Sequence, residues 1–280
     1  MKFDTSLPEM RDAIRRALEE DIGSGDVTSE LTIPVDLQAH GRFLSQQELV
    51  AAGVELLPMI YEFRGGAEVE LHASSGDRVR CGASLARASG SARMLLECER
   101  VALNFLQRLS GVATLARRYA DTISGAKARV LDTRKTTPGL RRLEKMAAAA
   151  GGVVNHRQGL FDAVLIKNNH ITAAGGVRKA LERAAQFSGP VEIEVRTRSE
   201  LQEALECGAK HLLLDNLSPP DAAEWIRYVD GRATVELSGG VNLDTIRRYA
   251  DAGPDFISCG AITHSAPAVD ISFRLDLELR

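Results

Sequence analysis

Cysteine and net charge are both scarce in this 280-residue chain, and each scarcity excludes a class of protein. The four cysteines are widely spaced and form no C-x-x-C pair, so neither a disulfide scaffold nor a cysteine-rich zinc site is expected. Lysine plus arginine number 35 and aspartate plus glutamate 38, so a net charge of −3 provides no general positive field for a nucleic acid. Any anion-binding site must therefore be local.

Long hydrophobic runs are also absent. The least polar stretch, residues 146–154, is rich in Ala and Gly and far shorter than the roughly 20 residues of a membrane helix. Near the start, Asp4, Pro8 and Glu9 stand where a secretory signal would need an unbroken apolar segment. With 44% hydrophobic and 26% charged residues, the composition is that of an ordinary globular protein, and we expect it to be cytoplasmic.

The pattern of predicted helices and strands changes along the chain and predicts two domains, 1–108 and 109–280. The C-terminal tail is a candidate to join the first domain. Met10, Ile14 and Leu18 recur at helical spacing after Pro8. Residues 68–73 alternate as a strand, and residues 78–87 are expected to return antiparallel. A helix is predicted over 92–109. The first domain is therefore expected to be mixed α+β.

From residue 129 onward, short apolar strands alternate with helices. Six strands are predicted: Val130–Asp132, Ala163–Ile166, Val191–Val195, His211–Leu214, Thr234–Leu237 and Phe256–Cys259. Ser199 and Gln202 suit the capping box of one intervening helix. Parallel strands joined by helices form either a barrel or an open doubly wound sheet. No G-x-G-x-x-G follows the first strand, which favours an α/β barrel.

Charged residues gather where these strands end, which is where barrel enzymes place their functional groups. The residues that stand there are Asp132–Lys135, Lys167–His170, Glu192, Glu194, Arg196, Asp215–Asn216, Glu236, Ser238–Gly240 and Gly260. Just before the second strand, Asn155–Arg157 adds further cationic candidates. Glu192 and Glu194 share one face of their strand because side chains alternate with period two. Two glycines after Ser238 would let backbone N–H groups approach a phosphate.

Simpler interpretations stay open for each residue. Strand-end charges often form salt bridges at the barrel mouth. Lys167 could be a Schiff-base nucleophile, an anion ligand or a partner of Glu192. His156 alone is more often structural than catalytic, and Ser238–Gly240 could be a plain turn. Taken together, however, cations facing a phosphate loop and carboxylates suit a strongly anionic substrate pair, with Mg²⁺ on a pyrophosphate. The cationic candidates are Arg100, Arg134, Lys135, Arg157 and Lys167.

Eight segments closely resemble the quinolinate phosphoribosyltransferase family, also called carboxylating nicotinate-nucleotide pyrophosphorylases. They are Gly25–Ser29, Glu99–Asn104, Asp132–Leu140, Asn155–Arg157, Leu165–His170, Glu192–Val195, Leu214–Asn216 and Leu237–Val241. The resemblance implies an N-terminal open-faced α/β sandwich packed on an incomplete, seven-stranded α/β barrel, and a homodimer. It also implies that quinolinate and phosphoribosyl pyrophosphate give nicotinate mononucleotide, pyrophosphate and CO₂ in NAD biosynthesis. The seventh strand is expected near Ala113–Leu115 or at the C-terminus.

The resemblance also assigns roles to residues of this chain. Quinolinate binding is implied for Thr133, Arg134, Lys135, His156, Arg157 and Lys167, with Arg100 reaching in from the neighbouring subunit. Glu194 and Asp215 would position the ribose hydroxyls and Mg²⁺, and the 5′-phosphate would meet Ser238, Gly239, Gly240, Gly260 and His264. The residues expected to be catalytic are Lys135, Lys167, Glu194 and Asp215. Decarboxylation is expected to follow glycosyl transfer, because the pyridinium ring can stabilise the carbanion left by CO₂.

Residues 146–154 depart from the family pattern, and Val153 cannot take a positive φ as cheaply as the glycine usual in this segment. Two rival functions have other requirements. A lysine-dependent lyase would use Lys167 but would not need the arginines, and a non-catalytic anion-binding paralogue would lack part of the cationic set. The chain keeps that set whole, which favours the transferase.

Overall fold

A computed structural model describes residues 3–277, and its contacts divide the chain into two compact units. The first unit contains the residues up to 117 together with 136–152 and 263 onward, and the second contains 118–135 and 153–262. The sequence placed the division at 108/109, whereas the segments 109–117 and 136–152 cluster with the first unit. The chain thus passes between the units more than once.

The framework of the first unit is an antiparallel sheet in the order β12-β1-β5-β3. Its strands are β1 (Gln38–Ser45), β3 (Glu68–Leu71), β5 (Ser84–Ser91) and β12 (Ile271–Leu277). A separate pair consists of β2 (Leu49–Val50) and β4 (Arg78–Val79). The single strand predicted over 78–87 is therefore wrong: Gly82, with a φ of 82°, breaks it into two strands that belong to different sheets. The predicted antiparallel return is made by β5 against β3.

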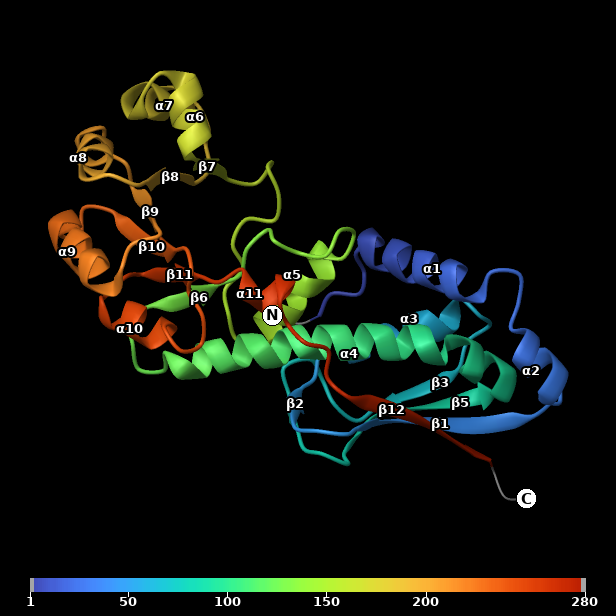
Figure 1. Cartoon of the computed structure of the whole chain (residues 1–280). Helices are drawn as coiled ribbons and strands as arrows, with labels where there is room; N and C mark the ends of the chain where they lie inside the picture. The colour runs from blue at the N-terminus through green and yellow to red at the C-terminus, as the bar shows by residue number, and fades with distance from the viewer. Residues whose placement is uncertain (1–2, 278–280) are drawn as a thin grey trace. The chain divides into compact units, whose positions relative to one another are not determined.

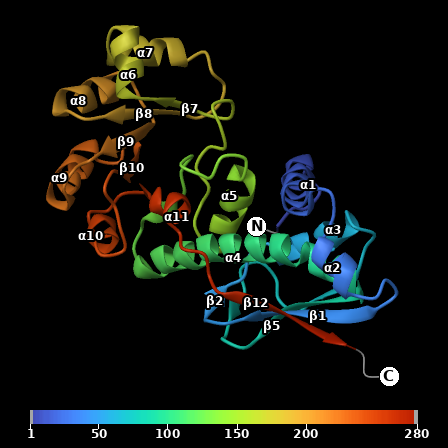
Figure 2. The same cartoon turned by 45° about the vertical axis from the view of Figure 1, so that its right-hand side comes forward.

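The helices of this part are α1 (Pro8–Ile22), α2 (Val27–Thr32), the 3₁₀ turn η1 (Val54–Leu56), α3 (Leu57–Glu62), α4 (Ala92–Thr122) and α5 (Arg141–Ala150). The predicted first helix is confirmed, and Met10, Ile14 and Leu18 are buried. Helix α4 lies along one side of the antiparallel sheet (Figure 1 and Figure 2). It runs beyond the predicted end at residue 109 and through Gly111, where a Cβ would lie 2.1 Å from the Pro267 carbonyl oxygen.

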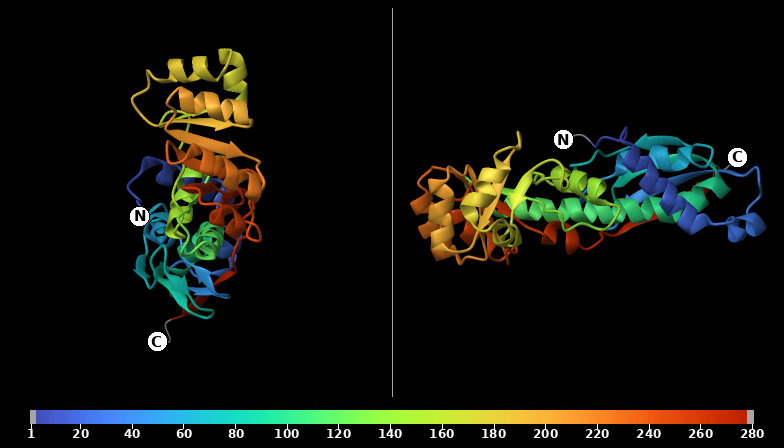
Figure 3. Two further views of the ribbon diagram at one scale, coloured as in Figure 1. Left: turned by 90° about the vertical axis from the view of Figure 1, so that its left-hand side faces the viewer. Right: turned by 90° about the horizontal axis from the view of Figure 1, so that it is seen from above.

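The second unit is built on a parallel sheet in the order β6-β11-β10-β9-β8-β7. Its strands are β6 (Arg129–Leu131), β7 (Val164–Ile166), β8 (Val191–Val195), β9 (His211–Asp215), β10 (Thr234–Ser238) and β11 (Phe256–Ser258). All six strands predicted from the sequence are confirmed. The helices between them are α6 (Asn168–Ala174), α7 (Val177–Ala184), α8 (Arg198–Glu206), α9 (Pro219–Val229) and α10 (Ile246–Asp251), and α11 (Ala261–His264) follows β11. Helices α6 to α10 lie on the outer side of the sheet (Figure 1 and Figure 3).

The sheet is a partial barrel, as expected, but its seventh strand is not where the sequence suggested. Residues 113–115 belong to α4, and the C-terminal strand β12 pairs with β1 in the other sheet. A single parallel bridge between Leu131 and Val154 extends the sheet beyond β6. Within the described residues the seventh strand of the barrel is thus reduced to one residue, Val154. The two edges of the parallel sheet are Val154 and β7.

The two faces of the parallel strands have opposite chemistry. Ile193 on β8 and Leu212 on β9 are fully buried and share a hydrophobic core with residues of α7, α8 and α9. Alternation along a strand then directs Glu192, Glu194 and Glu236 to the opposite, interior face. The helices are thus held by apolar packing, and the barrel interior contains charged side chains.

Two local expectations need comment. The capping box of α8 is formed by Thr197 and Glu200, not by Ser199 and Gln202, because the helix begins two residues earlier than the pattern of the latter pair requires. Val153 is not strained, since only Asn216 and Asp230 have a positive φ among the described non-glycine residues. No helix between residues 3 and 277 has both the length and the apolar character of a membrane span.

Candidate active site

The carboxyl ends of β7, β8 and β9 bring together Lys167, Glu194, Arg196 and Asp215, which we call the Glu194 cluster. Glu194 is buried, with 4% of its side chain exposed, and its Oε1 accepts hydrogen bonds from Arg196 Nε at 3.0 Å and Nη2 at 2.7 Å. Lys167 Nζ lies 3.7 Å from the other oxygen, Oε2. Arg196 Nη2 also lies 3.5 Å from Asp215 Oδ2. A fixed carboxylate is thus surrounded by two half-exposed cations that can move toward a ligand.

Asn216 joins this cluster to the loop after β10. Its φ is 57°, its side-chain amide donates to Asp215 Oδ2 at 2.7 Å, and its main-chain N–H donates to the Ser238 carbonyl at 2.9 Å. Gly239 has a φ of 97°, and a Cβ there would lie 2.2 Å from Asn216 Oδ1. The Ser238–Gly240 turn therefore packs directly against the residue that orients Asp215.

The turn has the properties of an anion site. Gly240 also has a positive φ, of 64°, and no described residue accepts a hydrogen bond from the main-chain N–H of Gly239 or Gly240. Successive N–H groups with positive-φ geometry form concave sites for phosphate oxygens. Gly260 lies in the short loop that follows β11, and β11 pairs with β10.

We expect Gly239→Ala to raise the KM for phosphoribosyl pyrophosphate more than tenfold. The new methyl group must displace Asn216, and the left-handed backbone adds about 1–2 kcal/mol. Steady-state kinetics with each substrate varied in turn measures this. Gly231→Ala is the matched control, because its φ is 69° and no atom lies within 4 Å of the added Cβ. Equal losses in both variants would mean that only backbone strain matters.

A second group in the barrel interior, the His156 cluster, contains His156, Glu192 and Glu236. His156 Nε2 lies 3.4 Å from Glu192 Oε2 and 3.4 Å from Glu236 Oε2. Burial lowers the pKa of His156, but hydrogen bonds with the two carboxylates outweigh this effect and raise it to about 9. Burial raises the pKa of Glu192. The ligand atoms lie within 4.8 Å of one another, so the geometry could also hold a metal ion.

Asp132 at the end of β6 fixes the loop that carries His156. Fully buried, it accepts a hydrogen bond from Asn155 Nδ2 at 2.6 Å and one from the His156 main-chain N–H at 2.8 Å. The next main-chain N–H, of Arg157, donates to His156 Nδ1 at 2.7 Å. The loop is thus held by side chains at its start.

Arg134 and Arg157 form the cationic side of the interior. Burial, and then the nearby positive charge of Arg134, lower the pKa of Arg157. Arg157 Nη1 donates to the Ala163 carbonyl at 3.0 Å. After β6, the Lys135 main-chain N–H donates to Thr133 Oγ1 at 3.1 Å, and the Lys135 side chain is exposed. Two arginines that repel each other in a partly buried site favour an anionic ligand between them.

Two predicted residues belong to the first unit. Arg100 is exposed on α4, and His264 at the end of α11 is exposed, with Nδ1 2.6 Å from Ser265 Oγ. Their place relative to the strand ends stays a prediction. The carboxylate beside Lys167 is Glu194, not Glu192. The sequence predicted no catalytic or ligand-binding role for Arg196, Asn216, Glu192 or Glu236. Their position at strand ends was the available signal, but their pairing depends on the register of neighbouring strands.

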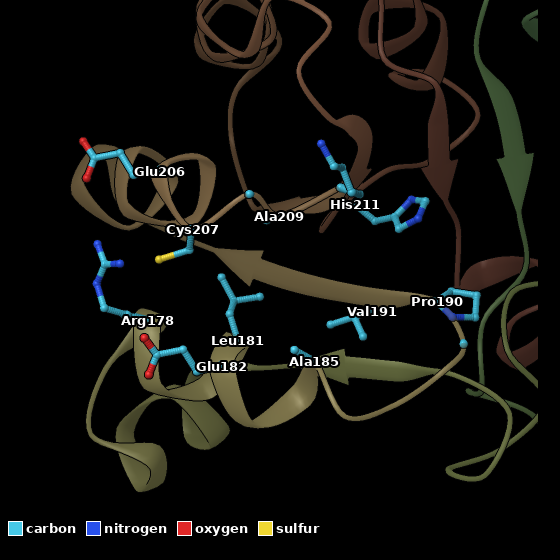
Figure 4. Close-up of a pocket in the computed structure, with 13 residues that line it drawn as sticks. Arg178, Leu181, Glu182, Ala185, Pro190, Val191, Glu206, Cys207, Ala209 and His211 are labelled. Carbon is cyan, nitrogen blue, oxygen red and sulfur yellow. The ribbon is translucent and has the colours of Figure 1, made fainter.

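A cavity of about 590 Å³ lies at the other end of the parallel strands (Figure 4). Arg178, Glu206, Cys207 and His211 are among the residues that line it. It lies at the amino ends of β8 and β9, whereas barrels of this kind place their chemistry at the carboxyl ends. The cavity is therefore separate from the candidate active site.

Comparison with known proteins gives one consistent result. The family model for the N-terminal domain of quinolinate phosphoribosyl transferase matches residues 26–110, and that for the C-terminal domain matches residues 112–274. A mitochondrial quinolinate phosphoribosyltransferase [decarboxylating] of Nicotiana tabacum is 40% identical, over 97% of this chain and 83% of its own. A probable nicotinate-nucleotide pyrophosphorylase [carboxylating] of Bacillus subtilis is 37% identical, over 92% and 90%. The solved nicotinate-nucleotide pyrophosphorylase of Francisella tularensis superposes with a TM-score of 0.92 at 35% identity, over 97% and 98%.

Proposed function

Because this chain belongs to the quinolinate phosphoribosyltransferase family, we propose that it transfers phosphoribosyl from phosphoribosyl pyrophosphate to the nitrogen of quinolinate. The products are nicotinate mononucleotide, pyrophosphate and CO₂, and the reaction belongs to NAD biosynthesis. The observation that best supports this is the contact of the Ser238–Gly240 turn with Asn216, which orients Asp215 of the Glu194 cluster. A phosphate site and a site for sugar hydroxyls are thereby joined in one structure.

The quinolinate end of the site consists of cations. Arg134 and Arg157 supply the charge for the two carboxylates. Lys135, Lys167 and His156 complete the set together with the Thr133 hydroxyl. Arginine suits this task because its planar donors match a carboxylate bidentately. With its carboxylates fixed, the ring nitrogen can be aimed at the sugar C1.

Glu194 and Asp215 serve the phosphoribosyl end. Both carboxylates contact one guanidinium, so their oxygens converge on a common region. Carboxylate oxygens are the ligands that Mg²⁺ prefers, and this ion usually completes its shell with water and substrate phosphates. The two residues thus fit an ion held jointly with pyrophosphate, and such an ion would neutralise the leaving group. Arg196 is half-exposed and can leave the carboxylates when the ion binds.

The protein contributes positioning and electrostatics, not covalent attack. Pyrophosphate departs from a carbon with oxocarbenium character, so a carboxylate near the sugar stabilises the developing charge. The ring nitrogen then bonds to C1 and becomes a pyridinium. When the adjacent carboxylate leaves as CO₂, its electron pair stays on the ring carbon, which the pyridinium stabilises until a proton is taken up.

The direct test is to incubate the purified protein with quinolinate, phosphoribosyl pyrophosphate and Mg²⁺. Nicotinate mononucleotide should appear in equal amount to CO₂ and pyrophosphate. Omitting either substrate is the control. Borohydride trapping with a carbonyl substrate tests the rival lyase: a covalent adduct at Lys167 without nucleotide formation would contradict the proposal. The cytoplasmic location expected from the sequence stays a prediction.

Mg²⁺ dependence is the next expected result. Activity should vanish with EDTA and return with Mg²⁺, because protein cations alone poorly neutralise adjacent phosphates. Glu194→Gln and Asp215→Asn should raise the Mg²⁺ concentration needed for half-maximal rate more than they raise the KM for quinolinate. Full activity in a verified metal-free assay would remove the ion from the scheme.

We also propose a homodimer in which Arg100 acts in the partner's site. Arg100 is exposed on α4, and in the sequence it precedes all the strands of the parallel sheet. Arg100→Ala and Lys135→Ala subunits should each be inactive alone. After re-equilibration, a mixture should recover about a quarter of wild-type activity, because half the dimers are mixed and each has one intact site. Mixed dimers that form but stay inactive would place Arg100 in its own subunit or outside the site.

A further inference from the structure

Glu144 on α5 is a fully buried carboxylate, and both of its oxygens are engaged. Its Oε1 accepts hydrogen bonds from Arg108 Nε at 3.0 Å and Nη2 at 2.7 Å, and from the Thr137 hydroxyl at 2.7 Å. Its Oε2 accepts the Thr137 main-chain N–H at 3.0 Å. A buried charge is tolerated when it is paired and hydrogen-bonded in this way. The carboxylate therefore holds Arg108 and Thr137 in one arrangement.

Arg108, on α4, also holds a second segment of the chain. Its Nη1 donates to the Ala266 carbonyl at 2.8 Å, and its Nη2 donates to the Thr263 carbonyl as well as to Glu144. Thr263 and Ala266 are buried, whereas His264 between them is exposed. One guanidinium thus fixes both ends of the segment 263–266 and leaves its middle open to a ligand.

Both anchored segments lie where the chain passes from the second unit to the first. These passages fall at 135/136 and 262/263. Thr137 closes the loop 132–137 that follows β6 and carries Lys135, and the segment 263–266 follows β11. Strands β6 and β11 are hydrogen-bonded neighbours, so the chain leaves the sheet at adjacent points. The ion pair of Glu144 and Arg108 is therefore a common anchor for the loop 132–137 and the segment 263–266.

We propose that Glu144 and Arg108 are positioning residues that set the loop 132–137 for quinolinate and the segment 263–266 for the 5′-phosphate of phosphoribosyl pyrophosphate. The inference rests on the proposed function, in which the loop supplies cations and His264 meets the phosphate. Replacing a buried ion pair by apolar residues of similar volume is often neutral for stability, so this pair serves mainly to fix geometry. A displacement of about 1 Å in a binding group can cost as much as 100-fold in rate.

Three variants separate the two ends of the site. Thr137→Val removes the hydroxyl but keeps the main-chain N–H, so it should raise the KM for quinolinate about fivefold and leave that for phosphoribosyl pyrophosphate within twofold of wild type. Arg108→Lys keeps the charge beside Glu144, but one ammonium cannot reproduce the planar donors that reach both carbonyls. It should raise the KM for phosphoribosyl pyrophosphate about tenfold and that for quinolinate at most about threefold. Glu144→Gln should raise both. The inhibition constant of phthalate should follow the KM for quinolinate.

Two exchanges of the same kind elsewhere serve as matched controls. Arg42→Lys alters an exposed ion pair with Asp276 in the antiparallel sheet. Thr122→Val removes a hydroxyl that donates to the Arg118 carbonyl within α4. Both should have wild-type KM values for the two substrates. The thermal midpoint of every variant is measured alongside, so that a loss of stability can be told from a loss of positioning.

Other outcomes would overturn the proposal. Equal rises in both KM values for Thr137→Val and Arg108→Lys, or a lower thermal midpoint with unchanged kinetics, would make the ion pair structural only. An unchanged KM for phosphoribosyl pyrophosphate in His264→Ala would leave the segment 263–266 without a ligand to position, and would contradict the proposal. Should Glu144→Gln fail to fold, the other two variants still decide, because Thr137 is exposed and lysine keeps the ion pair. An inactive wild-type enzyme contradicts the proposed function, whereas an active one with unaffected variants contradicts this inference alone.

Discussion

Nicotinate is expected to be at best a very poor substrate, with a kcat/KM about 10⁴-fold below that of quinolinate. Quinolinate has two carboxylates and nicotinate has one, so nicotinate would leave part of the cationic set without a counter-charge. Burial, and then the positive charge of Arg134, lower the pKa of Arg157, so two cations without a substrate are already unfavourable in this part of the site. Unpaired donors in a partly buried site are expensive.

Steady-state kinetics with both pyridines measures this discrimination. Phthalate is the matched control, because it keeps both carboxylates and should compete with quinolinate without reacting. Values of kcat/KM within about tenfold of each other for the two pyridines would mean that the cations recognise something other than the second carboxylate.

Arg134→Ala and Lys135→Ala should each nearly abolish turnover while leaving the fold intact. Removing a charged partner from a buried contact costs roughly 2–5 kcal/mol, which corresponds to about 30- to 5,000-fold in kcat/KM. Lys135 is exposed and Arg134 half-buried, so neither supports the core of the sheet. The loss should therefore appear in kinetics and not in the thermal midpoint.

Lys179→Ala, an exposed lysine on α7, is the control for charge removal from the same unit. It should retain wild-type kinetics. Near-normal activity of Arg134→Ala or Lys135→Ala would return that residue to a salt bridge at the barrel mouth. A large fall in thermal midpoint with either variant would likewise point to a structural role.

The sequence predicted the parallel strands well because each is a short segment with several β-branched or other apolar residues, followed by a change to polar or glycine-containing sequence. It placed the end of α4 too early, at residue 109, whereas the helix continues through Gly111, which packs against the Pro267 carbonyl. The seventh strand had no pattern to find, since it is reduced to the bridge at Val154. The sequence thus predicts elements that have a clear local pattern. It does not predict features that depend on which distant residues come together in the fold.

The same distinction applies to the candidate site. Glu194 and Asp215 stood out as polar residues at strand ends. The two groups in the interior depend on register: Glu194 and Glu236 both lie opposite Leu213, from either side of β9. No pattern along the sequence shows that the register of the strands brings Glu192 on β8 and Glu236 on β10 to the same His156 ring. The engagement of both His156 nitrogens was likewise beyond sequence reasoning, because it combines a local contact with two distant ones.

The incomplete barrel has a consequence for aggregation. An open sheet exposes unpaired N–H and C=O groups at its edges, and such edges can template the addition of another chain. Here β7 has three residues, and the opposite edge is the single bridge at Val154. Edges this short offer few hydrogen bonds to an invading strand. The open barrel therefore presents little surface at its own two edges on which another strand could be added.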